Sequence, residues 1–576
     1  MGGGCVVEWL GLRWTVNLVA ARDVLVFHRT VLLIIICKMN PTIQIRNIAL
    51  ECGVAVWTRS VVMRSDLTAC RFLSDNVDYR GFDNGDAMFT LRRRHTFDPK
   101  TKLKTRRQKF AKYMEDQYTH QHQGDVSMNT TEETMRQMGL PWIGETIDFI
   151  KAQKKNRLYE DFIQARIQKH GKTFKTRLMG YPTVVVNGAE ANKFFLSNEF
   201  KLVVSSWPSS SVQLMGENSI MEKQGDAHRC LRGIVATSLS SSGLEGLVPR
   251  ICQTIGTHLE KYWNGGEKVI SLYSLTKVLT FTIVLECLLG IEVKPGMLDL
   301  FERVLEGVFA APVNFPGSKF SRAKSARKEI ENVLVDIIRR KRKEMEKRKE
   351  KGREEEGILL SRLVGALIRG EISEVEVVDN VVLLVFAAHD TTSFAIAMTF
   401  RMLANHPHCC SVLEKEHTDI LSCKGPEETL TYEDTKKMNY TWQVARESMR
   451  IFPPIFGSFR KAIDDIEYDG YTIPKGWKVL WTAYGTHYDE EYFEDPLSFN
   501  PDRFEDPIQP YAFVPFGGGP RLCAGYQLAK LNILIFVHYV VTRYNWSLVS
   551  PDEPITIDPL PFPSQGMPIR ISPKLP

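Results

Sequence analysis

The stretch FGGGPRLCAG, Phe516 to Gly525, combines three consecutive glycines, a proline, an arginine and one cysteine near the end of a 576-residue chain. Such a loop suits four chemistries: a phosphate cradle, a redox loop, half of a zinc site, or a metal-bound thiolate. Both phosphate patterns fail, because no G-x-x-x-x-G-K-[ST] occurs and Leu522 stands where G-x-G-x-x-G needs its last glycine. No second cysteine lies near Cys523, which disfavours a dithiol switch.

A thiolate that binds one metal from one side fits this loop better. The next residues, YQLAKLNILIFVHYVV, predict an apolar helix, whose first N–H groups and dipole would stabilise a negative sulfur on Cys523. The glycines allow the backbone to pack against a flat ligand, and Arg521 is placed to pair with a carboxylate of that ligand. A haem with an axial cysteine meets these demands.

The overall composition is that of an ordinary globular protein. Hydrophobic residues make up 43% and charged residues 25% of the chain, and the formal charge is +6. A dedicated nucleic-acid binder would be more basic, so no nucleic-acid partner is expected. The eleven cysteines lack the spacing of a disulfide framework, which indicates a reducing compartment. The cluster of His406, His408, Cys409 and Cys410 is interpreted as a loop after a long helix.

The first 130 residues differ in texture from the rest. The apolar stretch Val24 to Cys37 is interrupted by His28 and Arg29, so it predicts at most a weak membrane anchor. The segment from Arg92 to Lys112 is strongly basic and predicts a linker. We therefore expect an atypical N-terminal extension over residues 1–130 and one catalytic domain over residues 131–576. Helical patterns dominate that domain, so its predicted class is mainly α with small β-sheets.

Two helical segments carry polar residues that need partners. The first, Val375 to Asn405, is apolar on all sides but has His389, Asp390, Thr391 and Thr392 in its middle. These form either a satisfied polar cluster, in which threonine hydroxyls bond to carbonyls one turn earlier, or an acid and an alcohol that relay protons. The residues alone leave both interpretations open.

The second segment contains Glu447 and Arg450, which share a helix face because they are three residues apart. Most pairs of this kind are solvated and contribute little. The apolar residues that follow make burial plausible, and a buried pair needs a further group to satisfy it. Arg503 is the candidate for that third group.

Taken together, these motifs resemble the cytochrome P450 monooxygenases. The family's haem-binding signature F-x-x-G-x-R-x-C-x-G is matched in full by Phe516, Gly519, Arg521, Cys523 and Gly525. The oxygen-activating motif is similar to Ala387–Thr392, with Ala388 in place of the usual glycine. The E-x-x-R and P-x-R-F motifs follow in the family's order.

The resemblance implies a role for each matching residue. Cys523 would ligate the iron of haem b, and Asp390 and Thr391 would deliver protons. Glu447, Arg450 and Arg503 would form a structural triad, while Arg521, Arg460 and Arg232 would contact the haem propionates, with His228 beside them. Gly519 would provide clearance for the porphyrin. The resemblance also implies an apolar substrate pocket, lined by the loop from Ser205 to Met221 and by Val382, Phe386, Ile455, Phe456, Phe459, Leu560 and Phe562.

The function implied by the resemblance is a plant monooxygenase that inserts one oxygen atom from O2 into a C–H bond of an isoprenoid: a triterpenoid, sterol, brassinosteroid or abscisic acid. Electrons would come from NADPH through NADPH-cytochrome P450 reductase, on the cytosolic face of the endoplasmic reticulum membrane. The alternative is a catalytically silent haem- or isoprenoid-binding protein, and an enzyme that binds nucleoside triphosphates through the cysteine loop is a third, disfavoured interpretation.

Overall fold

A computed structural model describes the backbone of five strands within residues 3–90 and, with their side chains, residues 143–348, 358–425, 428–558 and 560–574, together with the backbone of Lys349. The chain divides into two compact units, Met1–Ser127 and Met128–Pro576. In the first unit, β1 (Gly3–Trp9), β2 (Leu12–Leu18), β3 (Val62–Met63), β4 (Asp78–Gly81) and β5 (Ala87–Thr90) form one antiparallel sheet in the order β2-β1-β3-β5-β4. The predicted anchor, Val24–Cys37, and the basic linker lie outside the described residues.

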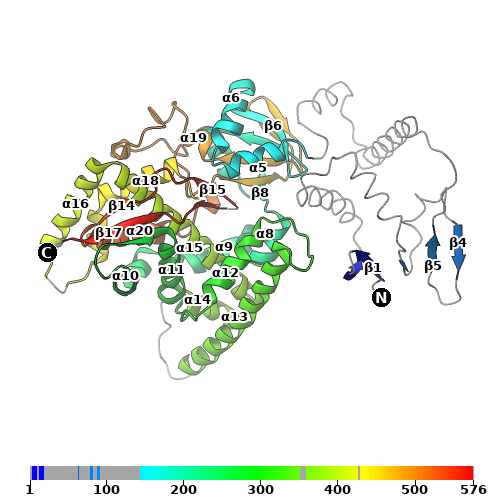
Figure 1. The fold of residues 1–576 in the computed structure, drawn as a ribbon, viewed down its shortest axis with the longest axis horizontal. Coiled ribbons are helices and arrows are strands. Elements are labelled where there is room, and N and C mark those ends of the chain that lie inside the picture. The colour runs from blue at the N-terminus through cyan, green and yellow to red at the C-terminus, as the bar shows by residue number, and fades with distance from the viewer. Residues whose placement is uncertain are drawn as a thin grey trace. The chain divides into compact units, whose positions relative to one another are not determined.

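The second unit is mainly helical with small sheets, as the sequence predicted (Figure 1). Its α-helices are α5 (Thr146–Lys154), α6 (Ala165–His170), α7 (Ala189–Ser197), α8 (Ser209–Met215), α9 (Gly225–Ser238), α10 (Ser241–Tyr262), α11 (Leu272–Thr282), α12 (Met297–Val308), α13 (Lys319–Lys349), α14 (Leu359–Ile368), α15 (Glu374–Asn405), α16 (Pro407–Ser422), α17 (Tyr432–Lys437), α18 (Asn439–Ile451), α19 (Tyr484–His487) and α20 (Tyr526–Val541). Short π-helical and 3-10 segments are η3 (Tyr159–Gln164), η4 (Ile283–Leu289), η5 (Pro501–Phe504) and η6 (Gly519–Arg521).

The strands of this unit form four separate sheets. The largest has the order β6-β7-β13-β10-β8, and the others are β14-β17-β9, β11-β12 and β15-β16. In Figure 1 the largest sheet lies with α5 and α6, apart from the bundle that contains α10 to α14. Their bounds are β6 (Thr173–Leu178), β7 (Tyr181–Val186), β8 (Val203–Ser205), β9 (Lys268–Ser271), β10 (Gly457–Ala462), β11 (Ile466–Tyr468), β12 (Tyr471–Ile473), β13 (Lys478–Thr482), β14 (Tyr544–Leu548), β15 (Ile555–Ile557), β16 (Pro561–Pro563) and β17 (Pro568–Pro573).

Helix α15 is the central element of the helical core. A capping box begins it, because the Ser373 side chain accepts from the N–H of Glu376 while the Glu376 carboxylate accepts from the N–H of Ser373. The helix contacts α11, α18 and α20, which explains why it is apolar on all sides. Its Asp379 pairs with Arg327 of α13 at 2.6 Å, so even the charged residues at this interface have partners.

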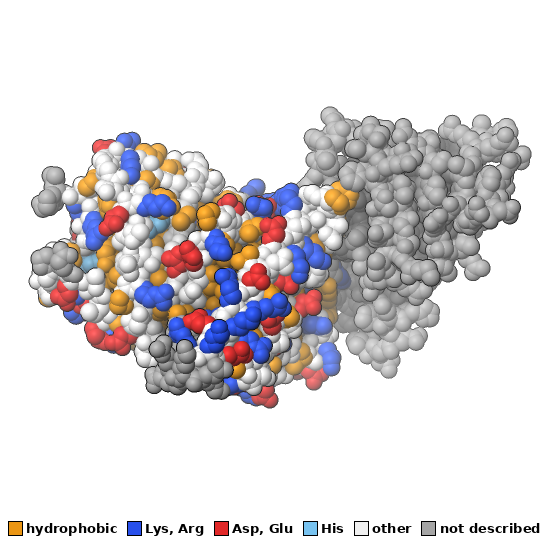
Figure 2. Space-filling view, turned by 90° about the horizontal axis from the view of Figure 1, so that it is seen from below, with side chains coloured by type: hydrophobic (Ala, Val, Ile, Leu, Met, Phe, Trp, Pro, Cys, Tyr) orange, Lys and Arg blue, Asp and Glu red, His pale blue; other side chains and the backbone are white. Residues whose placement is uncertain are grey.

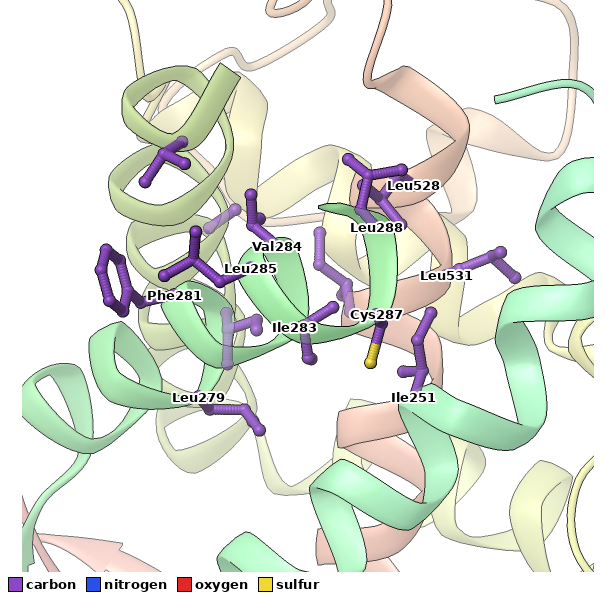
Figure 3. Packing of buried hydrophobic residues seen from close by; sticks show 14 of the residues in the cluster. Ile251, Leu279, Phe281, Ile283, Val284, Leu285, Cys287, Leu288, Leu528 and Leu531 are labelled. Carbon is purple, nitrogen blue, oxygen red and sulfur yellow. The ribbon is translucent and has the colours of Figure 1, made fainter. Parts of the chain in front are cut away.

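The segment η4 continues α11 deeper into the core. Its side chains pack with α10 and α20, and Cys287 points toward Ile251 of α10 (Figure 3). Gly290, with φ +67°, ends the segment in the left-handed conformation that favours glycine. Two continuous helical stretches of the described residues, Leu272–Leu289 and Glu374–Asn405, are long and apolar enough to cross a membrane, but most of each is buried inside the protein. We therefore regard both as core helices.

The prediction for the cluster around Cys409 is wrong. Residues 407–410 form the first turn of α16 and not a loop. Proline suits the first position of a helix, because it has no N–H group and its φ angle is already helical. No group of three or more potential metal ligands is found among the described residues. Acidic and basic side chains are intermixed on the face of this unit shown in Figure 2.

A buried histidine pair joins α16 to α20. His417 Nδ1 lies 3.0 Å from His538 Nδ1, and His417 Nε2 lies 2.9 Å from the hydroxyl of Thr441. That hydroxyl donates to Glu416, so His417 donates from Nε2 and its Nδ1 accepts from His538. Burial lowers the pKa of His417 to about 3 and that of His538 to about 4. Both rings are therefore neutral at pH 7.

We expect the free energy of unfolding to fall as the pH is lowered from about 6.5 to about 4, because the unfolded chain then binds protons that the folded pair excludes. The double variant His417→Gln, His538→Gln should show a shallower pH dependence, by up to about 1.4 kcal/mol per pH unit for each histidine removed. Denaturant unfolding followed by tryptophan fluorescence measures both slopes. Equal slopes in the two proteins would contradict this assignment.

Candidate functional site

The cysteine loop, Phe516 to Gly525, contains η6 and ends directly before α20, and hydrogen bonds within its own backbone close it. The N–H of Cys523 donates to the carbonyl of Phe516 at 3.0 Å, and the N–H of Leu522 donates to that of Gly519 at 3.0 Å. Gly519 has φ +64°, and a Cβ there would lie 1.9 Å from the carbonyl oxygen of Leu196. The structure therefore gives this glycine a reason other than porphyrin clearance: it lets the loop pack against the end of α7.

The Cys523 sulfur is placed to act as a thiolate ligand. The residue is exposed, although the surrounding protein desolvates the thiol and thereby raises its pKa. The N–H groups of Gly525 and Tyr526, at the start of α20, and the positive charge of Arg232 oppose that rise. A cation bound to the sulfur would add to these effects and favour the deprotonated form.

Two candidate carboxylate-binding residues lie one turn apart on α9. Arg232 makes no hydrogen bond or ion pair with any residue that the structure describes, and burial lowers its pKa. His228 is buried and its ring packs on Phe200 at 5.1 Å. Burial, Arg521 and Arg232 lower the pKa of His228 to about 4, so it is neutral at pH 7. The unpaired guanidinium of Arg232 near the thiol fits a ligand that carries carboxylates.

The other two arginines already have a protein partner, Glu199, which sequence reasoning missed. Its two carboxylate oxygens lie 2.6 Å from Nε of Arg460 and 2.6 Å from Nε of Arg521. Arg521 also donates to the carbonyls of Ile220, Met221 and Lys223. Arg460, on β10, donates from Nη1 to Ser458 and Phe459, while its Nη2 has no partner among the described residues. The residues present therefore fit a haem. The guanidinium of Arg232 and Nη2 of Arg460 have free N–H donors for its carboxylates.

On α15, Thr391 has the carbonyl partner expected of a satisfied polar cluster, and Asp390 has charged partners that a proton relay could use. The Thr391 hydroxyl donates to the carbonyl of Ala387 at 2.7 Å, which is the satisfied arrangement. Asp390 is buried and lies 3.3 Å from Lys277 Nζ, which in turn lies 2.7 Å from the partly exposed Glu302. Desolvation lowers the pKa of Lys277, but Asp390 and Glu302 outweigh it and the net shift is upward. This chain of charges leads from the middle of α15 toward solvent. Lys277 and Glu302 belong to no sequence motif.

The structure brings the predicted triad together. Arg450 contacts both carboxylate oxygens of Glu447 at 2.7 Å, and Nε of Arg503 lies 3.1 Å from Glu447. Both members of the pair are fully buried. The remaining donors of Arg450 go to the carbonyls of His487, Pro496 and Ser498, so the guanidinium is fully satisfied.

His487 connects this triad to the cysteine loop. Its Nδ1 lies 3.1 Å from the carbonyl of Arg450, and its Nε2 accepts from the N–H of Val514 at 3.0 Å. Complete burial and the charge of Arg450 lower its pKa to about 3, so it stays neutral and keeps both bonds. Val514 precedes the signature by two residues, so the buried pair and the loop form one hydrogen-bonded network.

The predicted pocket residues divide between clusters. Val382 and Phe386 are buried in the main core, where Phe386 lies 5.3 Å from Phe301, and Phe562 packs against the same cluster. Phe456 and Phe459 pack in a separate cluster with Phe149. Ile455 and Leu560 are partly exposed. Whether any of them contacts a substrate stays a prediction.

Comparisons with known proteins give one consistent answer. The family model described as Cytochrome P450 matches residues 136–572. Taxane 13-alpha-hydroxylase of Taxus cuspidata is 37% identical over 75% of this chain and 90% of that protein. Protopanaxadiol 6-hydroxylase of Panax ginseng and Cytochrome P450 716A1 of Arabidopsis thaliana are each 38% identical over 76% of this chain and 92% of their own. The solved structure "Retinoic acid bound cyanobacterial CYP120A1" matches with TM-score 0.67 and 29% identity, over 76% of this chain and 98% of that one.

We expect Glu447→Gln to destabilise the folded protein by about 3–5 kcal/mol, because it leaves Arg450 and Arg503 buried with too little negative charge. Glu433→Gln is the matched control: Glu433 is exposed and pairs with Lys436 on the surface, so little change is expected. Denaturant unfolding and the yield of haem-loaded protein measure the effect. Equal stability of the two variants would show that the triad is not a structural requirement.

Proposed function

The chain belongs to the cytochrome P450 family, and we propose that it hydroxylates a bulky terpenoid. As a member it is a haem-dependent monooxygenase, with haem b as its cofactor and electrons from NADPH through a reductase partner. The observation that carries the proposal is the Cys523 thiol at the start of α20, with the free donors of Arg232 and Arg460 nearby. We assign the catalytic domain to residues 131–576.

The substrate class rests on the names of the relatives. Several are hydroxylases of taxanes or taxoids, and one acts on protopanaxadiol. We propose a polycyclic terpenoid for this chain, in particular a triterpenoid or sterol. Val382 and Phe386 of α15, and Ile455, Phe456, Phe459, Leu560 and Phe562 from the later strands and loops, would supply the apolar contacts. A rigid hydrocarbon skeleton suits such residues, because burial of its surface provides the binding energy.

When bound, the haem supplies the activation of O2, and a thiolate ligand favours cleavage of the O–O bond by donating electron density. In this proposal Cys523 holds the iron from one side, and Phe516 and Gly525 keep the loop in place. Arg232 and Arg460 would bind the haem carboxylates, with Arg521 sharing Glu199 with Arg460 and the neutral His228 one turn from Arg232. Glu447, Arg450 and Arg503 fix the loop through His487 and need not touch the cofactor.

The reaction consumes protons, and we assign their delivery to Asp390 and Thr391. The Thr391 hydroxyl donates to Ala387, so its oxygen keeps a lone pair to accept a further hydrogen bond at the helix surface. The Asp390 carboxylate is the nearest acid in sequence. It pairs with Lys277, and Lys277 also pairs with Glu302. A swing of Lys277 toward Glu302 would free Asp390 to pass protons from solvent. Ala388 stands where the family usually has glycine, and its added methyl group would narrow the space beside this pair.

We propose NADPH-cytochrome P450 reductase as the electron donor and the cytosolic face of the endoplasmic reticulum membrane as the location. Both rest on the plant relatives. A silent haem- or isoprenoid-binding protein would have the same fold, but nothing among the described residues favours it. Turnover distinguishes the two.

The chain, expressed with a plant reductase in microsomes and fed a panel of triterpenes, sterols and taxanes, should hydroxylate at least one of them. Its reduced carbon monoxide complex should show the thiolate-type spectrum. Cys523→Ala should lose both properties, whereas Cys423→Ala, at an exposed cysteine away from the loop, should keep both. A Cys523→Ala protein that retained spectrum and turnover would overturn the assignment, and a thiolate spectrum without product from any terpenoid would favour the binding protein.

Asp390→Asn should lower kcat by about 10²-fold, the range of a lost proton donor, while leaving KM nearly unchanged. Thr391→Ala should instead let NADPH be consumed without product, because protons reach the site but are no longer directed. Parallel assays of product, NADPH and hydrogen peroxide separate the two effects. Thr399→Ala serves as the control. Thr399 lies further along α15, and its buried hydroxyl donates only to the carbonyl of Ala395. Unchanged coupling and rate in both site variants would refute the proton-delivery roles.

A further inference from the structure

We propose that Glu199 is a positioning residue for the haem: it holds Arg460 and Arg521 in place and sets the charge of the carboxylate-binding side of the site. This inference rests on the proposed function, because it takes those arginines to face the haem carboxylates. Neither the signature nor the other motifs include Glu199.

The contacts of Glu199 are those of a built site. The residue is 2% exposed, and each carboxylate oxygen lies 2.6 Å from a different guanidinium. The N–H of Ser205 also donates to it, at 3.0 Å. One carboxylate therefore joins β8, β10 and η6, which are far apart in sequence.

The backbone next to Glu199 is held in an unfavourable conformation. Phe200 has φ +69°, which is uncommon for a bulky residue, and its N–H donates to the carbonyl of Val203 at 2.7 Å. Its ring packs on His228 and lies 4.9 Å from the guanidinium carbon of Arg521. Strained residues of this kind persist where the surroundings hold them for a function. Here the tight turn directs Glu199 inward and Phe200 onto Arg521.

Hydrogen-bond counting shows what Glu199 does to each arginine. Arg521 donates from Nε to Glu199 and makes three further bonds to backbone carbonyls, so one of its five N–H donors is left. Arg460 keeps both donors of Nη2. The backbone carbonyls of Ile220, Met221 and Lys223 thus occupy Arg521. Arg460, whose Nε lies against Glu199, is therefore the main donor of this pair to a haem carboxylate.

Glu199 also offsets positive charge on this side of the site. Arg232, Arg460 and Arg521 bring three positive charges, and Glu199 is the carboxylate in direct contact with two of them, while Glu222 acts on Arg521 from a greater distance. Haem b carries two carboxylates, which would meet the remaining positive charge, and His228 is neutral. Buried charges in an imperfect balance are costly, so the loss of Glu199 would leave one uncompensated cation next to the haem.

The test uses the haem-loaded protein and two readouts other than activity: the reduction potential, and the rate at which haem transfers to excess apomyoglobin. Glu199→Gln removes the charge at nearly constant size, so the potential should become more positive and haem transfer should quicken by at least about tenfold. Glu199→Asp keeps the charge but shortens the reach, so it should quicken transfer with the potential close to the original. Glu190→Gln, at an exposed position of α7, should change neither.

A double-mutant cycle with Arg460→Met separates positioning from general destabilisation. If Glu199 acts through Arg460, the Glu199→Gln shift in potential should be smaller in the Arg460→Met background. A shift of equal size in both backgrounds, or none in either, would overturn this inference while leaving the proposed function intact. An original chain that takes up no haem would instead overturn the proposed function. If Glu199→Gln does not fold, the same double-mutant cycle is run with Glu199→Asp and Arg460→Met. The rate of haem transfer is then the readout, and equal effects of Glu199→Asp in both backgrounds would overturn the inference.

Discussion

The buried pair of Glu447 and Arg450 is the interaction on which the site depends. Two opposite charges without exposure are costly to bury, and they are tolerated here because every donor of the guanidinium has an acceptor. Three of those acceptors are carbonyls of residues 487–498, and His487 carries the network on to Val514. The geometry of the cysteine loop is thus fixed by a hydrogen-bonded network that begins on α18.

A second network fixes the opposite side of the loop. Glu199 and the backbone of residues 220–223 hold Arg521, the arginine within the signature. The loop is therefore held from two directions, by a neutral histidine before it and by an ion-paired arginine within it. This leaves the Cys523 sulfur accessible while the backbone around it is constrained, which is what a ligand that must bind one metal in one orientation requires.

The sequence predicted the parts of the site that local pattern determines. The helix after the cysteine, the apolar α15 with its polar centre, and the shared face of Glu447 and Arg450 all follow from spacing along one helix. Glu199, Lys277 and His487 could not be found in this way, because each acts through partners that lie tens to hundreds of residues away and none belongs to a motif. The contact of Gly519 with Leu196 also could not be found, since Leu196 belongs to another element. Likewise, His406 to Cys410 predict a loop after a long helix, whereas α16 begins at Pro407.

We propose that this chain activates O2 at a haem held by Cys523 and transfers one of its oxygen atoms to a terpenoid. Turnover under isotopically labelled O2 in ordinary water, with mass spectrometry of the product, identifies the source of that oxygen atom. We expect one labelled oxygen atom in each new hydroxyl group. A hydroxyl that carries only oxygen from water would refute the proposed monooxygenation.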